Sequence, residues 1–187
     1  VLIGEQGLYK TTWFNFLLPP ELRCYFYTKT NSDRLNKDDL FSLTEFALIC
    51  FEELDGMRPA ELNQLKAMVT MPYVNERAAY GRNKERHPHI ASFCGTGNNV
   101  QFLTDPTGNR RWLPFEVSQI RDPHLHAIPY ELVYSQAYAL WKSGFCHWFS
   151  QEEIRKLNIH NSRFEVPNLE EDLIRTHFRK PFEGEAG

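Results

Sequence analysis

The sequence predicts an α/β fold, a three-layer sandwich in which helices cover both faces of a mostly parallel sheet. Short apolar runs, such as residues 46–51 and 90–95, alternate with helical patterns, and continuous runs of this kind are typical of parallel strands buried on both faces. The chain has 187 residues, 42% of them hydrophobic, which is enough for one sizeable core with a small extension. We expect a core over residues 1–120 and a helical subdomain over residues 121–187.

The elements follow from local signals in chain order. A first strand at residues 1–3 leads into a helix that Pro19 and Pro20 stop. A short helix is expected at 38–43, and a longer one begins at Pro59, a residue favoured in a first helical turn. A polar segment at 73–88 predicts an inserted β-hairpin, and helices are expected at 130–142, after the cap residue Ser150, and at 169–178. The remaining predicted strands are 24–27, 46–51, 90–95 and 111–117.

Composition limits the cellular setting and the partners. The net charge of -3 excludes a uniformly basic surface, so a polyanion contact must be local. Four well-separated cysteines without a CxxC pair indicate free thiols in a reducing cytoplasm. No signal peptide or membrane span is visible, which predicts a cytoplasmic protein without a membrane partner. Because the first strand starts at residue 1, we expect the chain to be a piece of a longer protein.

A glycine loop between the first strand and the first helix predicts a phosphate-binding site. Gly4 and Gly7 leave room for close backbone approach, Lys10 supplies a cation, and the hydroxyl of Thr11 is suited to Mg²⁺. The motif has a glycine before the lysine, and here that position holds Tyr9. If the position needs a positive φ, Tyr9 carries a strain of roughly 1–3 kcal/mol. The alternative is an ordinary glycine turn before a helix.

Polar residues follow two of the later strands. Glu52 and Glu53 end an apolar strand, where one carboxylate suits the Mg²⁺ shell and the other suits polarisation of an attacking water. Thr96 or Asn98 follows a strand expected between the loop strand and the acidic strand, within reach of a γ-phosphate. The alternatives are a solvated strand end for the acids and a simple turn for the Gly-Asn segment.

Two clusters of basic residues complete the set. The first cluster is Arg110 and Arg111, whose guanidinium groups suit a neighbouring subunit's phosphoryl site or, equally, an internal salt bridge. The second is the hairpin, where cations around an aromatic ring suit single-stranded nucleic acid, although many solvated loops look alike. Its relevant residues are Arg77, Tyr80, Arg82, Lys84, Arg86, His87 and His89.

These segments together resemble the virulence-associated protein E family, helicase-like ATPases of phage and mobile-element replication proteins that are related to superfamily 3 helicases. The resemblance runs from Gly4 to Val117 and is strongest in residues 52–55, 76–82, 95–98 and 105–114. It implies a P-loop NTPase fold of the AAA+-like type. It also implies a primase-like region upstream in the full-length protein.

The resemblance also implies roles for individual positions. Asn98 corresponds to the sensor residue, Arg110 or Arg111 to an arginine finger, and Glu52 and Glu53 to the Walker B acids. Mg²⁺ would be held with the nucleotide by Thr11 and Glu52. The nucleotide-binding residues would be Gly4, Gln6, Gly7, Tyr9, Lys10, Thr11 and Thr12, and the DNA-binding hairpin residues Arg77, Tyr80, Arg82, Lys84, Arg86 and His87.

The resulting functional hypothesis is an ATP-hydrolysing, Mg²⁺-requiring ring of identical subunits that acts on single-stranded DNA in phage or mobile-element replication. Tyr9 motivates an alternative of another class, an assembly module that binds nucleotide or DNA with little catalysis. A small-molecule or nucleoside kinase fits less well, because the hairpin and the arginine pair would then have no task.

Overall fold

The structure is a computed structural model that describes residues 1–30, 36–76, 83–104, 109–167 and 169–178. Its centre is a five-stranded sheet with the order β2-β3-β6-β1-β7, and each neighbouring pair is parallel. The strands are β1 (Leu2–Ile3), β2 (Phe26–Lys29), β3 (Leu48–Phe51), β6 (Ser92–Gly97) and β7 (Phe115–Glu116). The predicted mostly parallel sheet is confirmed, and the strand before Asn98 lies between β1 and β3 as expected.

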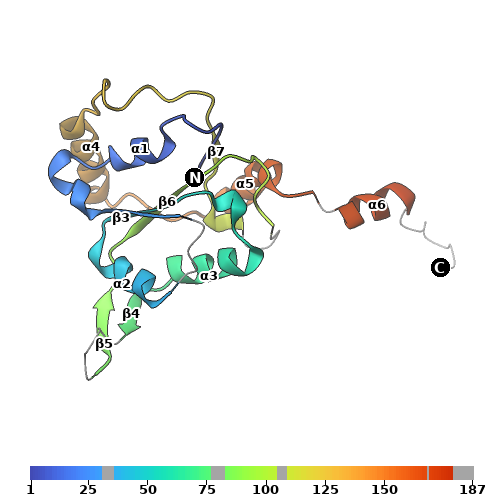
Figure 1. The fold of residues 1–187 in the computed structure, drawn as a ribbon, viewed down its shortest axis with the longest axis horizontal. Helices are drawn as coiled ribbons and strands as arrows, with labels where there is room; N and C mark the ends of the chain where they lie inside the picture. Colours follow the sequence, from blue (N-terminus) through green and yellow to red (C-terminus); the bar gives the residue numbers. More distant parts are fainter. Residues whose placement is uncertain (31–35, 77–82, 105–108, 168, 179–187) are drawn as a thin grey trace.

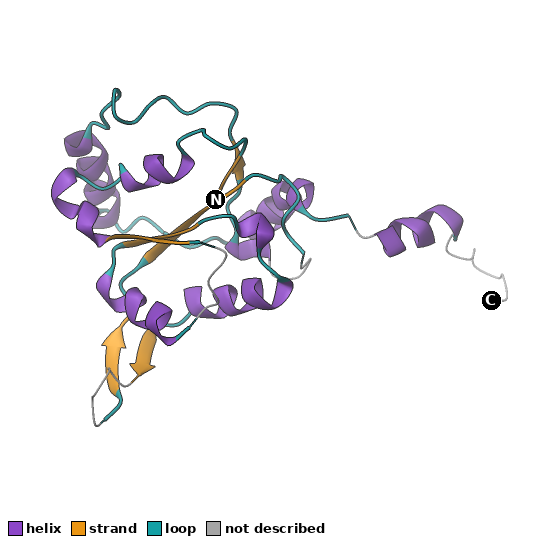
Figure 2. Cartoon of the chain, in the orientation of Figure 1, coloured by secondary structure: helices purple, strands orange, loops and turns teal. Residues whose placement is uncertain are grey.

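Helices cover both faces of this sheet (Figures 1 and 2). On one side lie α1 (Lys10–Asn15) and α4 (Tyr130–Lys142), and on the other α2 (Lys37–Glu45) and α3 (Pro59–Val69). The hydroxyls of Tyr130 and Tyr134 hold α4 against the end of α1 by donating to the carbonyls of Phe16 (2.6 Å) and Leu17 (2.9 Å). The arrangement is therefore the predicted three-layer sandwich.

The inserted hairpin is also confirmed. Strands β4 (Tyr73–Glu76) and β5 (Glu85–Pro88) pair in antiparallel fashion, and the hairpin projects away from the sandwich (Figure 1). Since β5 leads into the start of β6, the hairpin leaves the molecule at the amino ends of the parallel strands.

The predicted strands differ from the observed ones by a few residues. The strand expected at 46–51 begins at Leu48, the one expected at 90–95 is Ser92–Gly97, and 3₁₀ turns displace two more. The strand expected at 24–27 begins at Phe26, because the prolines open a 3₁₀ helix, η1 (Pro20–Tyr25), instead of only ending α1. The strand expected at 111–117 contains only Phe115–Glu116, because Asn109–Arg111 form another 3₁₀ turn, η3. The side chain of Asn161 stabilises that turn by donating to the carbonyls of Asn109 (2.8 Å) and Trp112 (3.0 Å).

Alternation along the strands divides the buried side chains between the two faces. Ile3, Ile49 and Phe51 belong to the main core beneath α2 and α3, whereas Leu2 and Cys50 pack with Phe14 of α1. Both clusters are continuous across neighbouring strands. The sheet is thus buried on both faces, which is why its strands read as unbroken apolar runs in the sequence.

The C-terminal elements contribute to the same core. After α5 (Gln151–Asn161), which begins with the predicted capping box of Ser150 and Glu153, the turn η4 (Ser162–Phe164) places Phe164 in the main core with no exposed surface. The last helix, α6 (Leu169–His177), lies apart from the sandwich (Figure 1). Among the described residues no helix is long and apolar enough to cross a membrane.

Candidate active site

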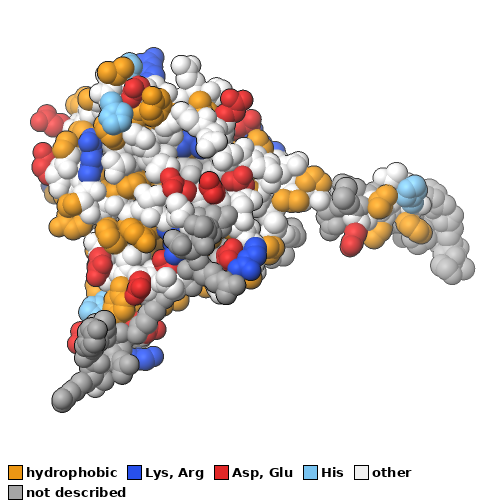
Figure 3. All heavy atoms as spheres, viewed as in Figure 1, with side chains coloured by type: hydrophobic (Ala, Val, Ile, Leu, Met, Phe, Trp, Pro, Cys, Tyr) orange, Lys and Arg blue, Asp and Glu red, His pale blue; other side chains and the backbone are white. Residues whose placement is uncertain are grey.

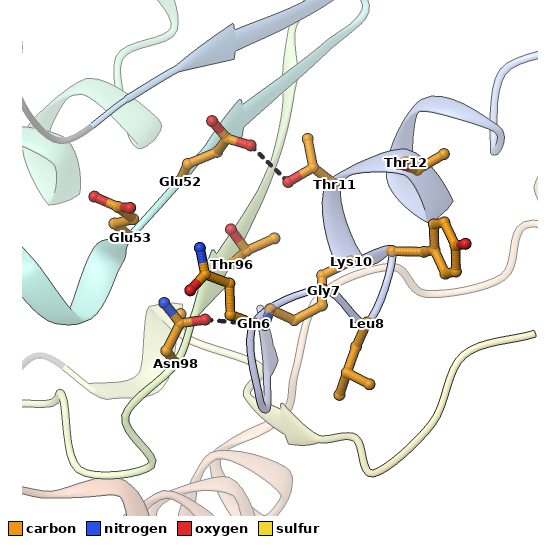
Figure 4. A pocket seen from close by; sticks show the side chains of 12 residues that line it. Gln6, Gly7, Leu8, Lys10, Thr11, Thr12, Glu52, Glu53, Thr96 and Asn98 are labelled. Atoms are coloured by element: carbon orange, nitrogen blue, oxygen red, sulfur yellow. Dashed lines mark hydrogen bonds between the residues drawn. The ribbon is translucent and has the colours of Figure 1, made fainter. Parts of the chain in front are cut away.

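A cavity of about 250 Å³ opens at the carboxyl ends of β1, β3 and β6 (Figure 4). Because these strands are parallel and adjacent, the segments that follow them meet at one edge of the sheet. The lining comes from the glycine loop and the start of α1 (residues 6–12), from the end of β3 (Glu52 and Glu53) and from the end of β6 (Thr96, Gly97 and Asn98). The structure therefore brings together the predicted loop, acids and sensor.

Two residues of the glycine loop, Gly7 and Tyr9, have a positive φ, a backbone conformation that glycine adopts most readily. Gly7 has φ 87°, and Tyr9 has φ 58° and ψ 21°, so the condition under which Tyr9 carries backbone strain is met. Gly4 is needed for a different reason than close approach to phosphate. A Cβ on Gly4 would lie 2.3 Å from the carbonyl oxygen of Val117, so the residue is required by the packing of β1 against β7.

Lys10 is held inside the site although it carries a charge. Its side chain is only 8% exposed, and Nζ donates to the carbonyls of Gly4 (2.6 Å) and Glu5 (2.7 Å) and to Oδ1 of Asn98 (3.1 Å). Burial lowers the pKa of Lys10, and the nearby Asp55 carboxylate opposes that shift. All three of these hydrogen-bond partners are neutral oxygen atoms.

The two acidic residues after β3, Glu52 and Glu53, have different surroundings. Oε1 of Glu52 accepts a hydrogen bond of 2.7 Å from the hydroxyl of Thr11, which ties β3 to the start of α1. Glu53 has φ 54° and ψ 44°, and Figure 4 shows its carboxylate on the far side of Glu52 from Thr11. The Thr11 hydroxyl and the Glu52 carboxylate, 2.7 Å apart, are oxygen ligands of the kind that Mg²⁺ prefers.

Asp55, which lies in the turn η2 (Leu54–Gly56) after the acids, has no role that its sequence position predicts. Its carboxylate accepts hydrogen bonds from the backbone amides of Asn98 (3.1 Å) and Asn99 (3.0 Å). The sequence signal was weak, because an Asp-Gly pair after a strand usually indicates only a turn. The partner amides, more than forty residues away, become visible only in the fold.

The paired arginines lie outside this cavity. Both are exposed and belong to η3, which precedes β7 and is therefore at the amino edge of the sheet, opposite the cavity. Arg111 lines a second cavity of about 270 Å³, together with Leu113 and with Val69 of α3. Within the described part of one chain, the structure does not bring either arginine to the residues around Lys10.

The hairpin carries its described cations on the surface (Figure 3). Lys84 and Arg86 are exposed, and the Arg86 guanidinium lies 3.6 Å from the centre of the Tyr73 ring. His87 is half-buried, with Nε2 3.6 Å from a carboxylate oxygen of Glu85. The other predicted DNA-binding residues, Arg77, Tyr80 and Arg82, lie outside the described residues.

Comparison with solved structures finds matches to the C-terminal region of NrS-1, in an apo structure and in an A form of it. The TM-scores are 0.48 and 0.46, each at 13% sequence identity and each covering 87% of this chain. The matches cover 34% and 33% of those chains, so this chain spans about a third of their length. None of the curated proteins matches the sequence.

Comparison with protein families gives a match over most of the chain. The matching family is described as the virulence-associated protein E-like domain, and the match extends over residues 1–166. That range includes the glycine loop, both glutamates, Asn98, the hairpin and the arginine pair. The chain therefore belongs to the virulence-associated protein E-like domain family.

Proposed function

We propose that this domain is a P-loop ATPase, the motor of a helicase-like ring that acts on single-stranded DNA during replication of a phage or mobile element. The observation that carries the proposal is the meeting of Lys10, Thr11, Glu52 and Asn98 around one cavity. A cation, a hydroxyl, a carboxylate and an amide at the carboxyl edge of a parallel sheet suit phosphoryl transfer.

Lys10 is the residue that binds the β- and γ-phosphates in this proposal. Its ammonium is buried among two carbonyl oxygens and one amide oxygen, and phosphate oxygens would replace these neutral acceptors with charged ones. The attraction between the ammonium charge and the phosphate charges in this buried site favours the exchange. Thr12, in the first turn of α1, also lines this cavity.

Thr11 and Glu52 are the residues that would hold Mg²⁺. Their oxygen atoms are already 2.7 Å apart, and oxygen ligands from a hydroxyl and a carboxylate fit this ion. When bound with ATP, Mg²⁺ neutralises negative charge on the phosphates. Because the Thr11 hydroxyl donates its proton to Glu52, its lone pairs would be free to face the ion.

Hydrolysis requires a water molecule on the γ-phosphorus and departure of ADP. Glu53 orients this water and accepts its proton as the oxygen bonds to phosphorus, while the bond from the γ-phosphorus to the bridging oxygen breaks. The Asn98 amide, next to Lys10 in the cavity, fixes the position of the γ-phosphate or the water. Each of these groups lines the same cavity.

The ring and DNA parts of the proposal rest on the opposite edge of the sheet. Arg110 and Arg111 are exposed there, so they act on a nucleotide bound by a neighbouring subunit. The hairpin also leaves the molecule at this edge, with Lys84 exposed for contact with a DNA backbone. Phosphate contact by cations and stacking on an aromatic ring suit a single strand.

Steady-state ATP hydrolysis by the full-length protein, with and without single-stranded DNA, tests the proposal. We expect Lys10→Ala to abolish Mg²⁺-dependent turnover in both conditions, because no other described side chain places a cation in the cavity. Lys156→Ala is the matched control, since Lys156 is an exposed lysine on α5 that pairs with Glu152 and lies away from the cavity lining. Turnover that persists without Lys10 would show that this cavity is not the ATPase site.

A second arm of the same experiment addresses DNA. Arg82→Ala combined with Lys84→Ala should weaken binding of a single strand and lower the slope of log affinity against log salt by about 2, one for each phosphate contact. Arg86 stays intact because its contact with Tyr73 also supports the hairpin. The control is Arg155→Ala with Lys156→Ala on α5, and an equal change in both pairs would remove the hairpin from DNA binding.

A second candidate function is an assembly module that binds nucleotide weakly. Two observations favour it: the strained backbone of Tyr9 and the three protein oxygens that already satisfy Lys10. The thermal stability of the protein with Mg-ATP separates the candidates, because ligand at a hundred times its Kd adds about 2.7 kcal/mol to folding stability. A rise that disappears in Lys10→Ala favours the ATPase.

A further inference from the structure

The turn after β3 is attached to the end of β6 at two points. Leu54 is 1% exposed and packs against Gly95 so closely that a Cβ on the glycine would lie 2.4 Å from Leu54 Cδ1. One residue later, the Asp55 carboxylate accepts from the amides of Asn98 and Asn99, one on each oxygen. A buried side chain and a charged acceptor therefore hold η2 on the same strand end.

Backbone features on both sides are needed for this attachment. Glu53 takes a left-handed conformation, φ 54°, immediately before the turn, and a non-glycine residue there costs of order 1–3 kcal/mol. Gly97 leaves space for the carboxylate, because a Cβ would lie 2.9 Å from Asp55 Oδ1. The strain at Glu53 and the absence of a side chain at Gly97 both allow Asp55 to contact the amides of Asn98 and Asn99, the residues that follow β6.

The turn that Asp55 holds carries Asn98, whose Oδ1 lies 3.1 Å from Lys10 Nζ. We propose that Asp55 is a positioning residue, which fixes the Asn98 turn by accepting its amides and so keeps the Asn98 side chain opposite Lys10 in the cavity. The inference rests on the proposed ATPase function. Asp55 itself does not line the cavity among the described residues, so it does not touch the nucleotide; its hydrogen bonds reach the site through Asn98, and its charge also acts on Lys10.

The expected kinetic signature is a loss of kcat with little change in KM for ATP. Asp55→Asn keeps the size of the side chain but has one acceptor oxygen for two amides, so the turn loses a charge-assisted bond. We expect kcat to fall about tenfold to a hundredfold, as for a misplaced catalytic group, while Lys10 still binds phosphate. Asp55→Ser, whose hydroxyl accepts one amide at most, should behave alike.

A double-mutant cycle tests whether Asp55 acts through Asn98. In an Asn98→Ala background, Asp55→Asn should cost less than about twofold in kcat, because the group it positions is already gone. Glu153→Gln is the matched control, since Glu153 also accepts a backbone amide, that of Ser150 at 2.8 Å, but at the start of α5. An equal loss of kcat in both backgrounds, or a rise in KM at constant kcat, would overturn the inference.

Hydrogen exchange of the full-length protein without nucleotide gives a readout that does not depend on turnover. In Asp55→Asn, peptides spanning residues 95–101 should exchange about tenfold faster or more at the Asn98 and Asn99 amides, with the rest of the sheet unchanged. Unchanged exchange there would contradict the inference. If the unmodified protein shows no Lys10-dependent hydrolysis, the proposed function fails, and the exchange result alone decides whether Asp55 holds the turn.

Discussion

At the scale of single residues, backbone strain is concentrated at one place. Tyr9 and Glu53 are the two non-glycine residues with positive φ in the described part of the chain, and both line the cavity around Lys10. Tyr9 lies between β1 and α1, and Glu53 lies between β3 and η2, so more than forty residues of sequence separate them. Strained residues of this kind persist where surrounding structure holds them, and they cluster at functional sites.

Substitution of Tyr9 measures that strain directly. We expect Tyr9→Gly to be more stable than Tyr9→Ala by about 1 kcal/mol, because alanine keeps the left-handed penalty that glycine lacks. The opposite order is expected at Ala67, an exposed interior position of α3, where Ala67→Gly should lower stability by about 1 kcal/mol. Urea denaturation of the three variants checks both values, and an alanine at position 9 as stable as glycine would exclude strain.

At the scale of elements, a buried ion pair joins α2 to β2. Lys29 and Asp39 are each 4% exposed, and Nζ lies 2.8 Å from Oδ1 and 2.9 Å from Oδ2. Asp39 also accepts the amide of Asn36 within the capping box that begins α2. One carboxylate therefore starts the helix and attaches it to the edge strand of the sheet.

Removing one member of this pair should be costly. We expect Asp39→Ala to destabilise the fold by about 3–5 kcal/mol, because it removes the Asp39 carboxylate from the buried Lys29 ammonium. Lys29→Met combined with Asp39→Leu should recover part of that loss, since no charge then remains buried. Glu152→Ala, which breaks the exposed pair with Lys156, is the control and should change the melting temperature little. Equal effects of Asp39→Ala and Glu152→Ala would show that burial of the pair contributes nothing.

At the scale of the whole molecule, the candidate chemical groups lie at opposite edges of one sheet. Lys10, Glu52 and Asn98 are at the carboxyl edge, and Arg110 and Arg111 precede β7 at the amino edge. A single subunit therefore does not complete the set that the proposed reaction needs. In the ring that we propose, the arginine of one subunit would reach the cavity of the next.

Mixing of two inactive variants tests this arrangement. Lys10→Ala lacks the phosphate cation, and the double variant Arg110→Ala with Arg111→Ala lacks the neighbour's guanidinium. In an equal mixture of the full-length proteins, about a quarter of the interfaces combine an intact Lys10 with intact arginines, so ATP hydrolysis should return toward a quarter of the unmodified rate. The mixture of Lys10→Ala with unmodified protein serves as the reference for subunit exchange. If exchange occurs and activity does not return, the arginines do not act between subunits.

The sequence by itself determined the class of fold and the candidate residues, because these depend on local signals. Apolar runs set the parallel strands. Lys10 and Thr11 begin the helix after β1, and the two glutamates follow β3, so the topology brings them together. Local signals placed the starts of β2 and β7 wrongly, since the 3₁₀ turn before β7 is held by Asn161 from a distant helix.

Only the tertiary structure decided how the site is supported. The sequence contained Asp55, but its partners are amides brought near by the pairing of β3 with β6. It also contained Gly4, whose necessity comes from the carbonyl of Val117, the residue after β7. Side-chain type and spacing are properties of one segment, whereas amide acceptors and steric clearance depend on contacts between segments far apart in sequence, which pattern alone does not specify.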